Sequence, residues 1–189
     1  MTQHIFLTGK KHIGKSTLIQ KILDDYKKTA DGFLTVRTKN YLKNQYSVHM
    51  YHTKREGITL NESNLLFLCG KTDEHTADTF DLLGCNILSM CSDCSLIVMD
   101  ELGPHEADAT LFRKKILNLL DGQTPILGVL QEPAESFWPE IVNHQRLKSL
   151  QFLKTIGMTE LYSITFNVKF LLLNDYSRGY AIGTNQRVK

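Results

Sequence analysis

Two kinds of apolar pattern alternate along the chain, and together they predict its secondary structure. Short apolar runs predict strands over residues 5–8, 33–36, 65–69, 95–99, 125–130 and 161–166. The continuous run over 95–99 predicts a strand buried on both faces of a parallel sheet, and 125–130 is the next buried strand. Elsewhere apolar residues recur at helical spacing, which predicts helices over 15–26, 80–90, 106–121 and 147–154. Residues 46–52 alternate between apolar and polar, and predict a half-buried strand antiparallel to 33–36.

Strands that alternate with helices place the chain in the α/β class. We expect three layers, with a mostly parallel sheet flanked by helices on both faces. The chain has 189 residues, of which 42% are apolar, and this suits a single domain spanning residues 1–189. A short apolar segment covers 170–173, and residues 175–189 read as a tail.

Glycines and prolines indicate where several elements end. Asp31-Gly32 breaks the first helical pattern before the next strand, and Gly122 stands where a helix C-cap is expected. Pro133 and Pro139 predict a surface loop, and we expect its Trp138 to anchor the loop on the core. The helix over 80–90 would bury one face, formed by Phe80, Leu83, Ile87 and Met90.

Composition limits the partners and the compartment. The net charge of +2 gives no overall field that would draw nucleic acid or an anionic membrane, so we expect neither as a partner. No apolar run is long enough to span a bilayer, and no secretory leader is visible, so we expect a cytoplasmic protein. The four cysteines are then expected to be reduced, with Cys91 and Cys94 buried where a helix turns into a strand.

The strongest chemical signal is the segment from Gly9 to Ser16, which has the pattern G-x-x-x-x-G-K-[ST] between a strand and a helix. Backbone N–H groups of such a loop surround a triphosphate at the positive end of the following helix. Lys15 would reach the β- and γ-phosphates, and the Ser16 hydroxyl would ligate Mg²⁺. We assign nucleotide binding to Gly9, Lys10, Lys11, His12, Ile13, Gly14, Lys15, Ser16 and Thr17.

An acidic pair supplies the second half of the predicted site. Asp100 and Glu101 follow the strand over 95–99, and ligands of such sheets lie at the carboxyl ends of the strands. We expect Asp100 to hold Mg²⁺ together with Ser16, and Glu101 to act as the base that orients the attacking water. Arg37 is either an arginine that stabilises the γ-phosphate charge or an exposed residue at the end of a strand.

These segments resemble a known family. Residues 96–106 resemble the I-D-E-I-G-x-M-E run of the small P-loop nucleoside-triphosphatase family, first described from a thermophilic bacterium and present in animals as cancer-related nucleoside triphosphatase. Asp100, Glu101, Gly103 and Glu106 match that run, and His105 replaces its methionine. Residues 32–35 are similar to the family's G-F-Y-T segment, whereas Lys11-His12 replaces its usual Pro-Gly. The resemblance implies a P-loop NTPase fold and slow Mg²⁺-dependent hydrolysis of ATP, GTP and other nucleoside triphosphates.

Two other functions use the same loop. A small-molecule kinase would also need an acceptor pocket and usually an arginine-bearing lid, for which residues 39–55 are the one candidate segment. A nucleotide-gated adaptor would use its bound triphosphate to order a surface for a protein partner.

One further acidic residue has two possible roles. Glu106 would either support the metal shell or cap the N-terminus of the next helix, and we expect the cap.

Overall fold

The computed structural model describes residues 4–42, 44–54, 59–70 and 75–151. Within these ranges seven strands form one sheet: β1 His4–Thr8, β2 Ala30–Leu42, β3 Gln45–His52, β4 Leu65–Leu68, β5 Leu96–Leu102, β6 Ile126–Leu130 and β7 Leu147–Gln151. The helices are α1 Lys15–Asp25, α2 Thr76–Thr79, α3 Cys85–Ser89, α4 Thr110–Leu120, α5 Ala134–Phe137 and α6 Pro139–Val142, with the 3₁₀ turn η1 Glu62–Asn64 and the π turn η2 Phe80–Gly84.

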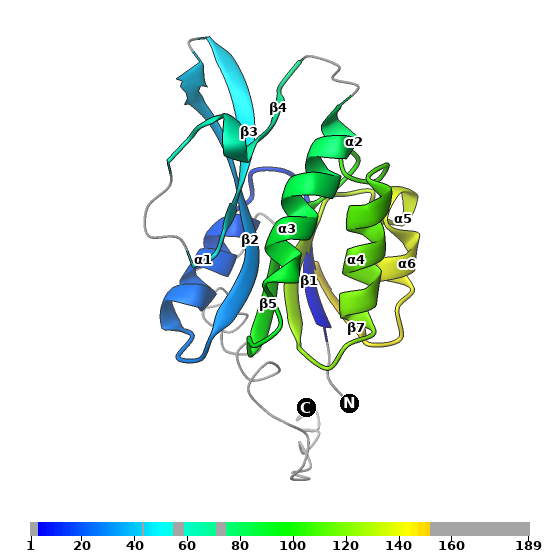
Figure 1. Ribbon diagram of the computed structural model, residues 1–189. Helices are drawn as coiled ribbons and strands as arrows, with labels where there is room; N and C mark the ends of the chain where they lie inside the picture. The colour runs from blue at the N-terminus through cyan, green and yellow to red at the C-terminus, as the bar shows by residue number, and fades with distance from the viewer. Residues whose placement is uncertain (1–3, 43, 55–58, 71–74, 152–189) are drawn as a thin grey trace, which may run out of the picture.

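The strand order in the sheet is β4-β3-β2-β5-β6-β1-β7. The pairs β2–β5, β5–β6, β6–β1 and β1–β7 are parallel, whereas β2–β3 and β3–β4 are antiparallel. The β2–β3 hairpin stands above the rest of the sheet (Figure 1). The sheet is therefore mostly parallel, with an antiparallel extension on one side.

Helices cover both faces of the parallel part, as the sequence predicts. Alternate residues of β1 point to opposite faces of the sheet. Phe6 packs with α3, α4 and α6 on one face, and Ile5 and Leu7 pack with α1 on the other. Figure 1 shows α1 on one side of the sheet and α3 and α4 on the other. All three residues are fully buried, and the phosphate loop therefore starts from a strand that is fixed on both faces.

The predicted helix over 147–154 is wrong where the structure describes it. Residues Leu147–Gln151 form strand β7, which pairs in parallel with β1 from His4↔Leu147 to Thr8↔Gln151. The leucine spacing in this short segment fits either element, and the open edge of β1 offers backbone hydrogen bonds that only a strand can accept. The predicted strand over 161–166, the segment 170–173 and the tail lie outside the described residues, so the single-domain boundary stays a prediction.

Smaller differences concern the ends of elements. Strand β2 already begins at Ala30, so Asp31-Gly32 lies inside the strand instead of before it. The loop between Pro133 and Pro139 contains the short helices α5 and α6, and Trp138 between them is fully buried, which confirms its role as an anchor. Met90, expected on the buried helical face, is 55% exposed because α3 ends at Ser89. No helix in the described ranges is long and apolar enough to cross a membrane.

Candidate active site

The phosphate loop connects β1 to α1 in the backbone conformation that its glycines allow. Gly9 has φ 136° and Gly14 has φ 102°, and these positive values explain why the pattern requires glycine at both positions. Gly14 is the N-cap of α1, so the free N–H groups of the first helical turn face the loop. The loop therefore presents backbone donors and the positive helix end to an anion.

Lys15 lies inside this loop. Its Nζ donates hydrogen bonds to the carbonyl oxygens of Gly9 (2.6 Å) and Lys10 (2.7 Å). Burial lowers the pKa of Lys15, and the nearby carboxylates, with Glu101 the strongest among them, act in the opposite direction. The buried ammonium group is thus hydrogen-bonded to two carbonyl oxygens instead of water. Phosphate oxygens of a bound nucleotide can take the place of these carbonyl oxygens.

Ser16 and Asp100 bring the two halves of the predicted site together. The Ser16 hydroxyl donates to Asp100 Oδ1 at 2.9 Å, and Thr35 contacts Asp100 Oδ2 through its backbone N (3.3 Å) and its hydroxyl (3.4 Å). Burial raises the pKa of Asp100 to about 6, against the effect of these hydrogen bonds. The two predicted metal ligands are therefore adjacent oxygen donors.

Glu101 is turned toward the site by an irregularity in β5. The register between β5 and β6 shifts between Met99 and Leu102, and Glu101 has a φ of 70°, which is unusual for a residue with a side chain. Its Oε1 accepts a hydrogen bond of 2.6 Å from Gln131 Nε2, at the end of β6. A strained backbone and a fixed carboxylate are typical of a functional position.

A cleft of about 620 Å³ joins these parts. Eight of the predicted site residues line it: Lys11, His12, Gly14, Lys15, Ser16, Thr17, Arg37 and Glu101. Gly9, Lys10 and Ile13 form the loop without lining the cleft, and Asp100 lies buried next to Ser16. The structure thus brings the loop, the acidic pair and Arg37 to one cavity.

Arg37, on β2, also lines this cleft. The side chain is exposed, and its guanidinium carbon is 3.8 Å from the centre of the Tyr46 ring. Stacking on an aromatic face holds the guanidinium while leaving its N–H groups available. The cation therefore borders the same cavity as the phosphate loop.

The expected capping role of Glu106 is wrong. Helix α4 begins only at Thr110, and its N-cap Ala109 makes no side-chain cap. Instead Glu106 is 4% exposed and its carboxyl group accepts a hydrogen bond from the backbone N–H of Gly103. Burial raises the pKa of Glu106 to about 8, so this side chain closes the turn after β5 in a largely protonated form.

Gln131 and Thr35 were not among the residues that the sequence analysis assigned to the site. Gln131 directly follows the predicted strand over 125–130, so the rule that ligands lie at the carboxyl ends of strands would have found it. Thr35 closes the segment 32–35 on which the family resemblance rests. Its contact with Asp100 depends on the pairing of β2 with β5, which the local pattern does not contain.

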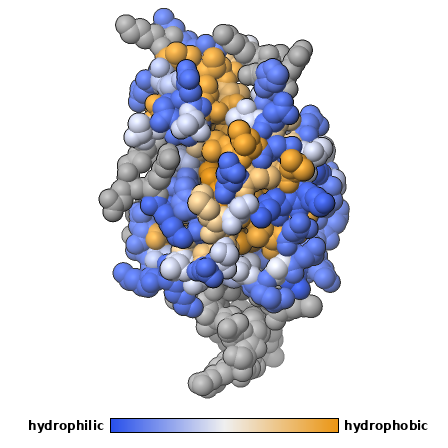
Figure 2. All heavy atoms as spheres, viewed as in Figure 1, coloured by the Kyte–Doolittle hydropathy of each residue, from blue (hydrophilic) through white to orange (hydrophobic). Residues whose placement is uncertain are grey.

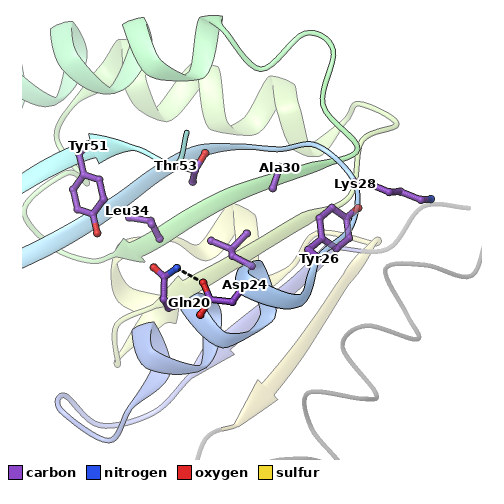
Figure 3. A pocket seen from close by; sticks show the side chains of 9 residues that line it. Gln20, Asp24, Tyr26, Lys28, Ala30, Leu34, Tyr51 and Thr53 are labelled. Carbon is purple, nitrogen blue, oxygen red and sulfur yellow. Dashed lines mark hydrogen bonds between the residues drawn. The ribbon is translucent and has the colours of Figure 1, made fainter. Parts of the chain in front are cut away.

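A second, smaller cavity of about 400 Å³ lies on the α1 face of the sheet. Leu23 and Tyr26 near the end of α1 line it together with Leu34 and Tyr51 of the β2–β3 hairpin. Figure 3 shows Leu34 and Tyr51 on the hairpin above α1. The rim carries Gln20, whose amide donates to Asp24 at 2.9 Å. None of the predicted site residues lines this cavity, so the candidate active site is the larger cleft.

A family model described as NTPase matches residues 4–160. The chain belongs to this NTPase family. The match spans the phosphate loop and the acidic pair, and it confirms the resemblance found in the sequence. It also confirms that the chain is a nucleoside-triphosphatase.

Two curated relatives are similar to the chain over about two thirds of its length. Both are described as nucleoside-triphosphatase THEP1. The protein of Methanosarcina barkeri is 29% identical over 133 residues, which cover 67% of this chain and 75% of the relative. The protein of Methanosarcina acetivorans is 27% identical over 132 residues, with 67% and 74% covered.

Two solved structures share the fold. THEP1 from the hyperthermophile Aquifex aeolicus matches with a TM-score of 0.69 and 18% identity, over 90% of this chain and 99% of that structure. A human cancer-related nucleoside triphosphatase matches with a TM-score of 0.61 and 23% identity, over 94% and 100%. These matches confirm the predicted three-layer P-loop NTPase fold.

Proposed function

We propose that this nucleoside-triphosphatase hydrolyses ATP, GTP and other nucleoside triphosphates to the diphosphate and phosphate, and that the reaction requires Mg²⁺. The proposal rests on the 2.9 Å contact between Ser16 and Asp100, which joins the phosphate loop to the acidic pair. Glu101 follows Asp100 directly and faces the same cleft. One bound triphosphate can therefore contact both halves of the site.

The residues at the contact suit Mg²⁺. A hydroxyl and a carboxylate are hard oxygen donors, and Mg²⁺ in nucleotide sites takes only one or two protein ligands beside phosphate oxygens and water. Ser16 and Asp100 would hold the ion. When bound, the ion would neutralise charge on the β- and γ-phosphate oxygens. Asp100 is the better ligand when ionised, and Thr35 and Ser16 hold its carboxylate in place through hydrogen bonds.

The chain's own residues account for the remaining chemistry. Lys15 exchanges its two carbonyl partners for phosphate oxygens, and the loop N–H groups fix the phosphates. Glu101 accepts a proton from water while the water oxygen bonds to the γ-phosphorus and the bond to the β,γ-bridging oxygen breaks. Gln131 holds the Glu101 carboxylate, and Arg37 adds a cation to the lining of the cleft.

Broad base tolerance follows from what the site residues contact. The loop from Gly9 to Ser16 would bind the phosphates through its backbone N–H groups and Lys15, and every nucleoside triphosphate carries the same phosphates. We therefore expect ATP, GTP, CTP and UTP to be hydrolysed at similar rates.

Phosphate release from these four nucleotides, with Mg²⁺ and with EDTA, tests the proposal. We expect release with Mg²⁺ for all four and none above the protein-free rate with EDTA. Asp100→Asn should raise the Mg²⁺ concentration needed for half-maximal rate by about tenfold or more, since a charged ligand is lost. Asp93→Asn, at an exposed position, is the matched control. Full activity in EDTA would refute the metal requirement, and release from one nucleotide alone would refute the broad specificity.

A further inference from the structure

We propose that the same cleft also binds a planar, ring-bearing small molecule with a primary hydroxyl group, and that the site transfers the γ-phosphoryl group to this hydroxyl. The inference rests on the proposed function, because it uses the same nucleotide and the same base. The second substrate would occupy the part of the cleft that neither the attacking water nor the phosphates fill.

The order of the strands indicates which part of the cleft this is. The phosphate loop follows β1, and Glu101 lies on β5, which is nearer to β2, β3 and β4 in the sheet. In the proposed reaction the terminal phosphate lies next to Glu101, and the nucleoside would then extend to the other side of the loop. The space between Glu101 and the β2–β4 strands therefore lies beyond the terminal phosphate, where an acceptor has to bind for in-line transfer.

This end of the cleft has an apolar wall. Val48 of β3, Leu66 and Phe67 of β4 and Phe80 at the start of η2 line the cavity. Apolar side chains gather on this face of the molecule between the β3–β4 strands and the helices α2 and α3 (Figure 2). Hydrolysis needs only a water molecule at Glu101, and an apolar wall contributes nothing to holding water. Concave apolar surface with a few convergent polar groups is instead typical of a small-molecule site.

A ring pair gives the acceptor its expected shape. The Phe67 and His105 rings lie 4.3 Å apart between centroids, with an interplanar angle of 35°. Both residues line the cleft, and the charges of Lys11 and Glu101 are close enough to His105 to affect its pKa. Partial burial and Lys11 lower that pKa, so the ring is neutral at pH 7 and offers an aromatic surface. A planar ring bound here would stack on this pair with its hydroxyl directed toward Glu101.

The polar groups at the boundary suit phosphoryl transfer. The hydroxyl oxygen of the acceptor bonds to the γ-phosphorus, the bond from that phosphorus to the β,γ-bridging oxygen breaks, and Glu101 takes the hydroxyl proton. The products are a phosphate monoester and the nucleoside diphosphate. Arg37 lines the same cleft, and we expect its guanidinium to interact with the group in transit. The acceptor pocket that a kinase requires is therefore present, with an arginine on the adjacent hairpin.

The test incubates the full chain with γ-labelled ATP, Mg²⁺ and each of six probes: adenosine, guanosine, cytidine, uridine, thymidine and pyridoxine. Saturation-transfer NMR measures binding of each probe, and chromatography separates labelled ester from free phosphate. We expect at least one probe to bind and to yield a labelled ester. His105→Ala should lower the ratio of ester to free phosphate by about tenfold, the usual contribution of one stacked ring, and His105→Phe should restore it. Because the measure is a ratio, a loss of folded protein does not change it.

Leu111→Ala, at a residue that is 62% exposed on α4, is the control and should leave the ratio unchanged. Phosphate release without binding or ester formation for any of the six probes would overturn the inference and leave the proposed function intact. Ester formation that His105→Ala does not reduce would also overturn it, because the acceptor would then bind elsewhere. A chain that releases no phosphate in any reaction contradicts the proposed function itself.

Discussion

The side-chain amide of Gln131 donates a 2.6 Å hydrogen bond to Oε1 of Glu101 and thereby links the ends of β6 and β5. The backbone N–H of Gln131 also donates to the Leu102 carbonyl at 2.8 Å, so the strands pair again directly after the irregularity at Glu101. Gln131 thus holds the side chain of the predicted base and the backbone of Leu102, the residue directly after it. Two consequences for turnover follow.

Glu101→Gln should leave binding of Mg²⁺-nucleotide nearly unchanged and lower kcat by a factor of about one hundred or more, because the variant cannot accept the proton of the attacking water. Titration of a non-hydrolysable ATP analogue and steady-state phosphate release measure the two effects. Glu135→Gln, at an exposed position on α5, is the control. A Glu101→Gln variant that hydrolyses ATP at the parent's rate would show that another group acts as the base.

Gln131→Ala should lower kcat by about tenfold with little change in KM, because the carboxylate of Glu101 keeps its charge but loses the partner that orients it. If Gln131 acts only through Glu101, the double variant Glu101→Gln, Gln131→Ala should be no slower than Glu101→Gln alone. Additive losses in the double variant would indicate that Gln131 contacts the substrate directly.

Lys15→Ala should lower nucleotide affinity and turnover together, since the ammonium contacts phosphate oxygens in both the ground state and the transition state. We expect Kd for the nucleotide to rise by about tenfold or more. Fluorescence titration with a labelled ADP measures it, and Lys21→Ala on the exposed side of α1 serves for comparison. Unchanged ADP affinity in the Lys15 variant would contradict the assigned role.

Glu106 should make stability depend on pH. Burial raises its folded-state pKa from the ordinary 4.5 to about 8, so between these values the folded chain binds a proton that the unfolded chain has released. The stabilising contribution of the protonated Glu106 side chain to the free energy of unfolding is thus fully present below about pH 4.5. This contribution is lost as the pH rises toward 8. Glu106→Gln keeps a neutral side chain and an acceptor for the Gly103 N–H.

We therefore expect Tm of Glu106→Gln to match the parent near pH 5 and to exceed it increasingly up to about pH 8, as followed by thermal denaturation. Glu135→Gln should parallel the parent at every pH. A Tm difference for Glu106→Gln that stays constant with pH would mean that the carboxyl is already ionised in the folded chain.

Trp138→Phe should lower the free energy of unfolding by about 1–3 kcal/mol. The Trp138 indole is fully buried, and its Nε1–H donates to the Gly103 carbonyl at 3.0 Å, which the variant leaves without this donor. Urea denaturation at an unchanged m-value measures the loss. Leu111→Ala, on the exposed face of α4, should stay within about 0.5 kcal/mol of the parent. A Trp138→Phe chain as stable as the parent would show that water replaces the indole donor.

The sequence by itself determined the parts of this protein whose signals are local. The phosphate loop was predictable because Gly9, Gly14, Lys15 and Ser16 meet backbone and charge requirements within eight consecutive positions. The apolar runs that lead into the loop and into Asp100 were predictable as strands because a buried sheet requires apolar residues, although β5 continues past Asp100 and Glu101 to Leu102. The three-layer fold follows from the alternation of such strands with amphipathic helices.

Tertiary structure decided what depends on contacts between distant segments. Leu147–Gln151 became a strand because β1 has an open edge, and Glu101 points into the cleft because β5 shifts its register against β6. Pairing of β2 with β5 brought Thr35 to Asp100, and the packing of β4 beside the turn after β5 brought Phe67 to His105. A short run of residues carries the backbone preferences of its own members, but the partner across a sheet or a cleft is specified only when the whole chain has folded.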